Sequence, residues 1–163
     1  MFVNNPGLFP SYPLPTADQN AVAVRNAWNL YLRVRNNGWL SRIKALVTEH
    51  KKQLLDLETT EKQAHVSNRH YVGIRPVPIR QIHGSESRAG DFDWYFNPLQ
   101  THTKGRWLSV ATARLKGITL PPVTLIQIGE DYFVRDGHHR VSVANALGED
   151  YIDAEVTRAS SGA

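Results

Sequence analysis

Three adjacent residues near the C-terminus can carry positive charge, His138, His139 and Arg140. They follow Asp136-Gly137, at the point where a strand-like pattern changes to helical spacing. The first turn of a helix has free N–H groups and the positive end of the helix dipole, so cations there are unfavourable unless an anion is bound. The segment therefore predicts a phosphate-binding turn: Gly137 and the following N–H groups hold phosphate, the histidines neutralise it and Arg140 clamps it through paired N–H donors.

Asp136 has two interpretations. Its carboxylate can engage Mg²⁺ against the phosphates of a nucleotide such as ATP, ADP or CTP, because Mg²⁺ usually takes one or two carboxylates plus substrate phosphates. Asp136 can instead be only the N-cap of the helix, with Gly137 as a turn residue and both histidines exposed. Spacing alone leaves both interpretations open.

Two other segments can contribute to the same chemistry. In Ser85-Glu86-Ser87-Arg88, the Glu86 carboxylate can accept a hydroxyl proton as a catalytic base and Arg88 can contact a phosphate. The alternative is a surface loop with a local Glu-Arg pair of little energetic value. Lys104 and Arg106 precede a helical pattern, where they can bind ligand phosphates or be an ordinary basic helix start.

A sheet with attached helices must position these side chains, and the last two thirds of the chain have the patterns for one. β-Branched residues with two prolines predict an edge strand over 71–79. Two apolar runs around Gly129-Glu130-Asp131 predict a β-hairpin of residues 123–128 and 132–134. Helices are expected over 106–116 and 138–147, the second closed by Gly148, and a last strand over 151–156.

The first third of the chain predicts helices. Prolines make residues 1–15 an extended arm. Thr16 opens a helix that ends near Gly38, and a second helix follows over 39–55, so we expect a helical hairpin. The polar stretch 56–68 is a linker or a last short helix. The expected division is an arm and hairpin over 1–68, a second domain over 69–158 and a tail over 159–163.

Composition narrows the function. The chain has 163 residues, 19 Lys and Arg against 15 Asp and Glu, and no cysteine, which excludes disulfides, thiolate zinc sites and cysteine nucleophiles. The net charge of +4 suits an anionic partner such as nucleic acid or a nucleotide. Residues 1–15 lack the basic region of a signal peptide, and no stretch approaches the roughly 18 apolar residues of a membrane span. We therefore expect a cytoplasmic protein without a membrane partner.

Residues 74–156 resemble the ParB/sulfiredoxin superfamily. The resemblance rests on the order of Ile79-Arg80-Gln81-Ile82, Gly84-Ser85-Glu86-Ser87-Arg88, Gly117, Pro121-Pro122-Val123, the hairpin and a Gly-x-x-Arg turn. The turn reads Gly-Glu-Arg-Arg in ParB proteins and Gly-Cys-His-Arg in sulfiredoxins, where His138 occupies the position of the catalytic cysteine. Sulfiredoxin activity is thereby excluded. The turn is most similar to the Asp-Gly-His-x-Arg turn of ParB-like free-serine kinases, matched at Asp136, Gly137, His138 and Arg140.

The resemblance implies an α+β fold with a mixed sheet, here preceded by the helical hairpin. It also implies a nucleotide ligand and, from the kinases, Glu86 as base. We expect a nucleotide- or phosphate-binding protein, with Mg²⁺-dependent phosphoryl transfer or NTP hydrolysis as the possible activity. One alternative is a ParB-like DNA-binding protein or nuclease, although the helix-turn-helix region that follows this domain in partition ParB proteins has no counterpart after Val156. The other is a non-catalytic regulatory module that binds a small anion.

Overall fold

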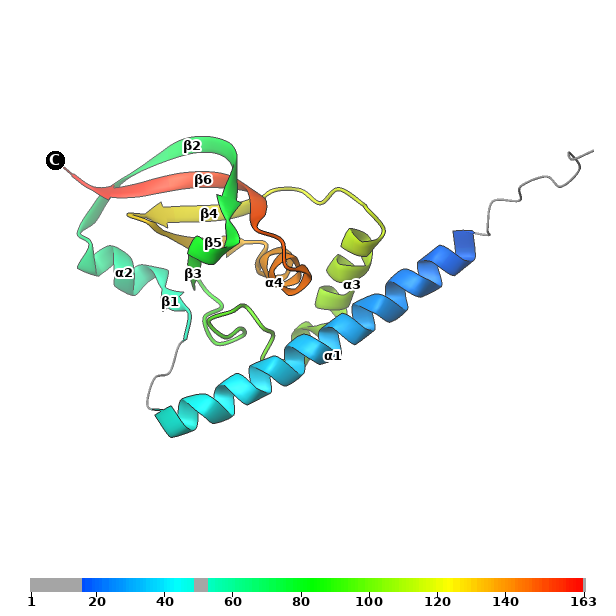
Figure 1. Ribbon diagram of the computed structural model, residues 1–163. Coiled ribbons are helices and arrows are strands. Elements are labelled where there is room, and N and C mark those ends of the chain that lie inside the picture. Colours follow the sequence, from blue (N-terminus) through cyan, green and yellow to red (C-terminus); the bar gives the residue numbers. More distant parts are fainter. Residues whose placement is uncertain (1–15, 49–52, 163) are drawn as a thin grey trace, which may run out of the picture.

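The fold is a mixed six-stranded sheet covered by helices, seen in a computed structural model that describes residues 16–48 and 53–162 (Figure 1). The strand order is β1-β3-β5-β4-β6-β2. The strands are β1 (Leu55–Asp56), β2 (Val66–Pro78), β3 (Ile82–Ser85), β4 (Val123–Ile128), β5 (Asp131–Asp136) and β6 (Tyr151–Ser161). The helices are α1 (Thr16–Thr48), α2 (Leu57–Gln63), α3 (Lys104–Leu115) and α4 (His138–Leu147), with short 3₁₀ turns η1 (Ile79–Gln81) and η2 (Thr101–Thr103). The predicted α+β class is confirmed.

The C-terminal half follows its local sequence patterns. β4 and β5 form the expected antiparallel hairpin, α4 has the expected bounds and β2 is an edge strand. Alternate residues of the hairpin belong to two core clusters. The cluster on the α4 side contains Val123, Leu125, Tyr132, Val134 and Val141. The cluster on the α2 side contains Ile126, Phe133 and Leu57. The period-two alternation of a strand thus gives the sheet two buried faces.

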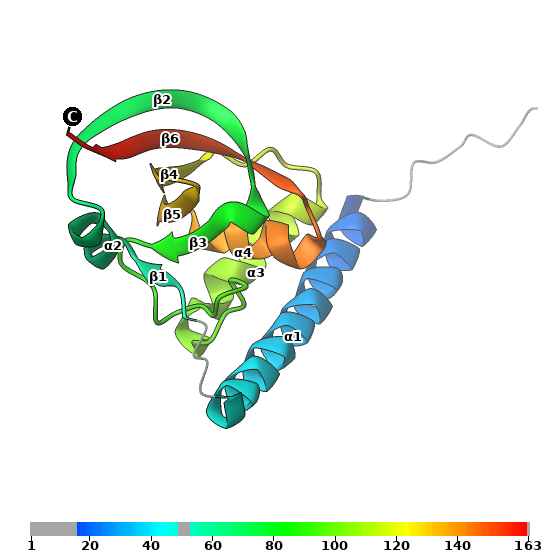
Figure 2. The ribbon, with the colours of Figure 1, turned by 60° about the vertical axis from the view of Figure 1, so that its left-hand side comes forward.

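The predicted helical hairpin is wrong, because α1 is one continuous helix from Thr16 to Thr48. Gly38 lies inside α1; a glycine in a helix costs about 1 kcal/mol relative to alanine and need not end it. Ala27 and Tyr31 of α1 pack on Trp107 of α3, with the Tyr31 and Trp107 rings 5.4 Å apart. The sheet, the α3 and α4 pair, and α1 therefore form three successive layers (Figure 2).

The expected domain limits also differ from the structure. β6 continues to Ser161 and pairs there with Val66, so residues 159–161 are strand and not tail. The expected boundary after residue 68 falls inside β2. The short helix expected in 56–68 is confirmed as α2, whose N-cap Asp56 accepts a hydrogen bond of 2.9 Å from the Thr59 N–H. The predicted arm over 1–15 lies outside the described residues, as do residues 49–52 of the predicted second helix.

None of the helices that the structure describes combines the length and the apolar character that a membrane-spanning helix needs.

Gly84 lies where neighbouring strands leave no room for a side chain, so its replacement should lower the stability of the protein. A Cβ there would lie 2.1 Å from Phe133 Cδ1 and 2.9 Å from the Leu55 carbonyl oxygen. Because both neighbours are fixed in the sheet, we expect Gly84→Ala to lower the free energy of unfolding by about 1–3 kcal/mol. Gly90→Ala is the matched control, since a Cβ at Gly90 meets nothing within 4 Å. Urea denaturation of both variants measures the difference, and equal stability would contradict the predicted clash.

Candidate functional site at the start of α4

The candidate site lies where two neighbouring parallel strands end. β3 and β5 pair in parallel up to Ser85 and Val134. The loop from Glu86 to Arg88 leaves β3, and Asp136-Gly137 leads from β5 into α4. The carboxyl ends of parallel strands share one edge of a sheet, which is a common place for ligand binding. The structure therefore brings together the two segments that carry most of the predicted site residues.

Both the backbone conformation and the neighbouring side chains require a glycine at position 137. Its φ is 97°, a left-handed conformation that L side chains rarely adopt. A Cβ at this position would lie 2.5 Å from Val123 Cγ1. No side chain caps the start of α4, and its first turn contains no acidic residue. The N–H groups of that turn therefore present positive partial charge without a capping carboxylate.

The two histidines differ from the prediction, because they are buried and uncharged. His138 is 6% exposed and His139 8% exposed. Burial, followed by the charge of Arg88, lowers the pKa of each imidazole to about 4. Both side chains are neutral at pH 7 and so cannot neutralise a phosphate as cations. Their rings point into the protein and pack against the ring of Phe92.

Ser85 is a residue of this site that the sequence reasoning missed. Its side chain is fully buried, and its hydroxyl oxygen accepts hydrogen bonds from the Arg88 N–H (2.9 Å) and the Ser87 N–H (3.3 Å). Its own proton is then directed to His138 Nε2, 2.8 Å away. Ser85 thereby fixes the loop after β3 to the first residue of α4. The signal available in the sequence was a serine at the end of a strand, in a position to form a local hydroxyl turn.

Arg140 is not the free phosphate clamp that the sequence predicted. Its Nη1 donates to the carbonyl oxygens of Pro121 (2.6 Å) and Pro122 (2.7 Å), and its Nη2 donates to Asp136 Oδ2 (2.7 Å). The side chain is only 15% exposed. Arg140 therefore ties the segment before β4 to the start of α4. The partners that occupy it lie mainly on a segment 18 or 19 residues away, which spacing within the turn does not reveal.

The two predicted catalytic carboxylates are both engaged in ion pairs. Glu86 receives hydrogen bonds from Arg135 Nε (3.0 Å) and Nη2 (3.1 Å) on the neighbouring strand β5. Asp136 is 75% exposed and has one oxygen bound by Arg140. Asp136 is a single exposed carboxylate that already neutralises an arginine, so the described residues alone do not supply the ligands of a resident Mg²⁺, and nucleotide phosphates or water would have to complete them. Within residues 16–48 and 53–162, no group of three His, Asp or Glu side chains is placed to hold a metal ion.

Two of the other predicted cations lie around the buried histidines. Arg88 is 44% exposed and lies 3.6 Å from Asp91, beyond hydrogen-bond distance. Arg106 is exposed at the start of α3. After burial, the charges of both arginines are the next causes of the lowered pKa of His139. Arg88 and Arg106 are therefore exposed cations whose charge acts on this buried histidine.

Lys104 lies apart from this group. Its Nζ is 4.2 Å from the ring centroid of Trp28 on α1, a cation–π contact that directs the side chain to the helical layer. Lys104 was predicted to contact a phosphate, but its side chain contacts Trp28 instead.

α3, which packs on α4, has a similar start. It begins without a side-chain cap hydrogen bond and without an acidic residue in its first turn. The Trp107 indole N–H, in the first turn of α3, donates to Ser142 Oγ in the middle of α4 over 2.8 Å. At the start of α4, the buried His139 Nδ1 has no hydrogen-bond partner among the described residues. The uncapped start of α4, the exposed Arg88 and one unpartnered imidazole nitrogen make this edge suited to an anion.

The buried histidines predict a pH-dependent stability. Their folded-state pKa of about 4 lies below the 6.5 of the free side chain, so unfolding takes up protons once the pH falls below about 6.5. Each histidine should then cost about 1.4 kcal/mol of stability per pH unit until about pH 4. Urea denaturation from about pH 7.5 to about pH 5 measures the slope. His139→Gln should reduce it by the share of one histidine, with exposed His70→Gln as control; an unchanged slope in His139→Gln would refute the account.

Comparisons with known proteins give one structural similarity. Neither a protein-family model nor a curated protein matches the chain. The structure is similar to the crystal structure of sulfiredoxin from Arabidopsis thaliana, with a TM-score of 0.34 and 17% sequence identity over 51% of this chain and 82% of that chain.

Proposed function

We propose that this protein binds a phosphate-bearing small molecule, with a nucleotide as the first candidate, at the edge formed by the starts of α3 and α4. One observation carries the proposal: α4 starts without a side-chain cap or an acidic residue, and the Ser85 hydroxyl that binds His138 at this start also binds the backbone N–H of the exposed Arg88. A bound phosphate would accept hydrogen bonds from the free N–H groups of α4 and compensate the charge of both arginines. Without an anion, this concentration of positive charge opposes the helix dipoles.

Each group has a defined part in the proposed complex. Gly137 allows the left-handed turn to pack against Val123, and this turn sets the direction of the first N–H groups of α4. Arg88 can turn from Asp91 to the phosphate at small cost, since their 3.6 Å contact is not a hydrogen bond. The neutral, buried histidine rings stabilise the turn by packing against Phe92. Arg140 holds the turn in shape through the three hydrogen bonds described above, so its replacement would disturb the fold as well as binding.

Thermal denaturation with added ligands tests the proposal. Inorganic phosphate, ATP, ADP and CTP are each added with and without Mg²⁺, and at about 100 times Kd a ligand stabilises the fold by about 2.7 kcal/mol. We expect at least one nucleotide to raise Tm by several degrees. Arg88→Gln and Arg106→Gln should each reduce the rise, whereas Arg25→Gln, an exposed position on α1, should leave it unchanged.

Two outcomes would contradict the proposal: no phosphate compound raises Tm, or the Arg88→Gln/Arg106→Gln double variant responds as the wild type does. A short DNA duplex is included as a separate ligand. Stabilisation by the duplex alone, lost steeply as salt is added, would instead favour the DNA-binding alternative.

Phosphoryl transfer or NTP hydrolysis is a second candidate, supported by the position of Glu86. This residue follows β3 directly, and its carboxylate lies at the same sheet edge as the proposed phosphate. Released from Arg135, Glu86 would be able to accept the proton of an attacking hydroxyl or water. The described residues do not fit a resident Mg²⁺, so we assign no step to a metal held by the protein.

Turnover measurements test this activity. If Glu86 is the base, Glu86→Gln should lower the rate of phosphate release from ATP or CTP by about 100-fold or more. The ligand-induced rise in Tm should persist in the same variant, because the glutamine leaves Arg88 and the start of α4 intact. Binding without measurable turnover in the wild type would refute the activity and favour a non-catalytic binding module.

A further inference from the structure

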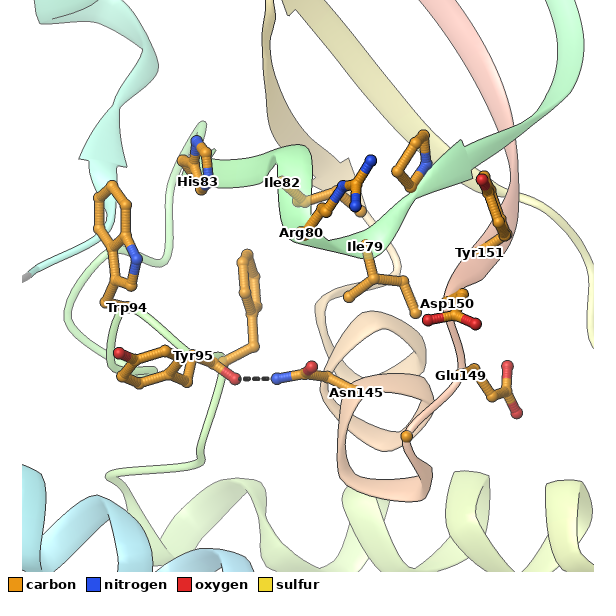
Figure 3. A pocket seen from close by; sticks show the side chains of 13 residues that line it. Ile79, Arg80, Ile82, His83, Trp94, Tyr95, Asn145, Glu149, Asp150 and Tyr151 are labelled. Carbon is orange, nitrogen blue, oxygen red and sulfur yellow. Dashed lines mark hydrogen bonds between the residues drawn. The ribbon is translucent and has the colours of Figure 1, made fainter.

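A cavity lies at the end of α4 opposite to the candidate phosphate site, and its lining residues are drawn in Figure 3. Its volume is about 610 Å³, within the range of small-molecule sites. Three segments enclose it: the end of β2 with η1 and the start of β3, the loop 94–96, and the end of α4 with the start of β6. None of the predicted site residues lines it. The ten residues of α4 separate the two places by roughly 15 Å.

The loop 94–96 is held firmly in place. Asp93, only 6% exposed, accepts hydrogen bonds from the N–H groups of Tyr95 (2.9 Å) and Asn97 (2.8 Å). Asn145 of α4 donates to the Tyr95 carbonyl oxygen over 2.5 Å. Phe96 has a φ of 56°, an unfavourable left-handed conformation for a residue with a large side chain. Such strained positions cluster at ligand-binding sites, where neighbouring bonds maintain them.

Aromatic rings are available on both sides of the cavity. Figure 3 shows Trp94 and Tyr95 on one side and Tyr151 on the other. Tyr95 is 55% exposed and Tyr151 57% exposed, so both retain uncovered ring surface. His83 stacks on Trp94 with ring centroids 4.8 Å apart and planes 13° from parallel. The cavity can therefore receive a flat ring against aromatic surface.

Two of the charged or titratable side chains around the cavity are paired with neighbouring residues, and two are not. His83 Nδ1 is 2.7 Å from Asp131, and Glu149 receives two hydrogen bonds from Arg114, of 2.8 and 2.7 Å. Arg80 and Asp150 remain, and neither has an ion-pair partner among the described residues. They lie on adjoining segments, because the Ile79 N–H donates to the Asp150 carbonyl oxygen over 3.0 Å. The cavity thus offers one positive donor and one negative acceptor.

We propose that this cavity is a second binding site, for a small, neutral, planar ring that carries an amide-type group. The carbonyl oxygen of such a group would accept from Arg80, its N–H would donate to Asp150, and the ring would lie against Tyr151, which directly follows Asp150. An anion would meet Asp150 and a cation would meet Arg80 at unfavourable cost. A neutral group with both a donor and an acceptor satisfies both side chains, which neither ion does.

Three probes of the same shape test the charge preference: benzamide is neutral, benzoate is an anion and benzamidine is a cation. Binding is measured by titration, from the shifts of the backbone N–H signals of Asp150 and Tyr151 in NMR spectra. We expect benzamide to bind about twofold to fivefold more tightly than either ion. Tyr151→Ala should weaken all three alike, by about threefold to tenfold.

Charge variants complete the test. Arg80→Gln should improve benzamidine relative to benzoate, and Asp150→Asn should do the reverse, while Arg158→Gln, exposed on β6, leaves the order unchanged. Arg80 and Asp150 are both exposed, so the fold should tolerate these changes. Three results would overturn the proposal: no probe shifts the Asp150 and Tyr151 signals, an ion binds wild type more tightly than benzamide, or neither charge variant changes the order. Since Arg88 and Arg106 are intact in every variant, failure here leaves the phosphate site untouched.

Discussion

The hydrogen bond between Ser85 and His138 is the contact on which the candidate phosphate site depends. It joins the end of β3 to the first residue of α4 in a place with no access to water. A buried hydroxyl and a buried imidazole each need a partner, and each supplies the other's. Because the Ser85 oxygen also accepts the Arg88 N–H, the same hydroxyl fixes the backbone that carries Arg88. The position of the most relevant cation thus follows from one buried polar contact.

Burial of the histidines changes the source of positive charge at this edge. A charged imidazole in such a place would be strongly unfavourable, so His138 and His139 are neutral at pH 7. The charge comes instead from Arg88 and Arg106, whose guanidinium groups remain charged at any pH where the protein is folded. Arg88 and Arg106 therefore keep their charge across the physiological range, and the histidines contribute shape and stability.

Sequence patterns predicted the elements whose signals are local. The hairpin, α4 and the glycine at its start were all readable, because alternation, helical spacing and a left-handed glycine act within a few residues. The hairpin of helices was wrong at Gly38, where the glycine penalty was too small to end α1. Arg140 was misassigned because its partners, Pro121 and Pro122, come from a distant segment. Burial of the histidines likewise depends on Phe92 and on packing that no spacing within the turn encodes.

Ser142 makes α4 the common support of both proposed sites. Its hydroxyl accepts the Trp107 indole N–H over 2.8 Å and donates to the Phe96 carbonyl oxygen over 2.6 Å. The first contact fixes the first turn of α3 to α4, which carries the candidate phosphate site. The second contact fixes the loop 94–96, which lines the cavity. One buried hydroxyl in the middle of α4 thus fixes an element of each site. The two sites are separate in chemistry, but the rigidity of each rests on the packing of the same short helix.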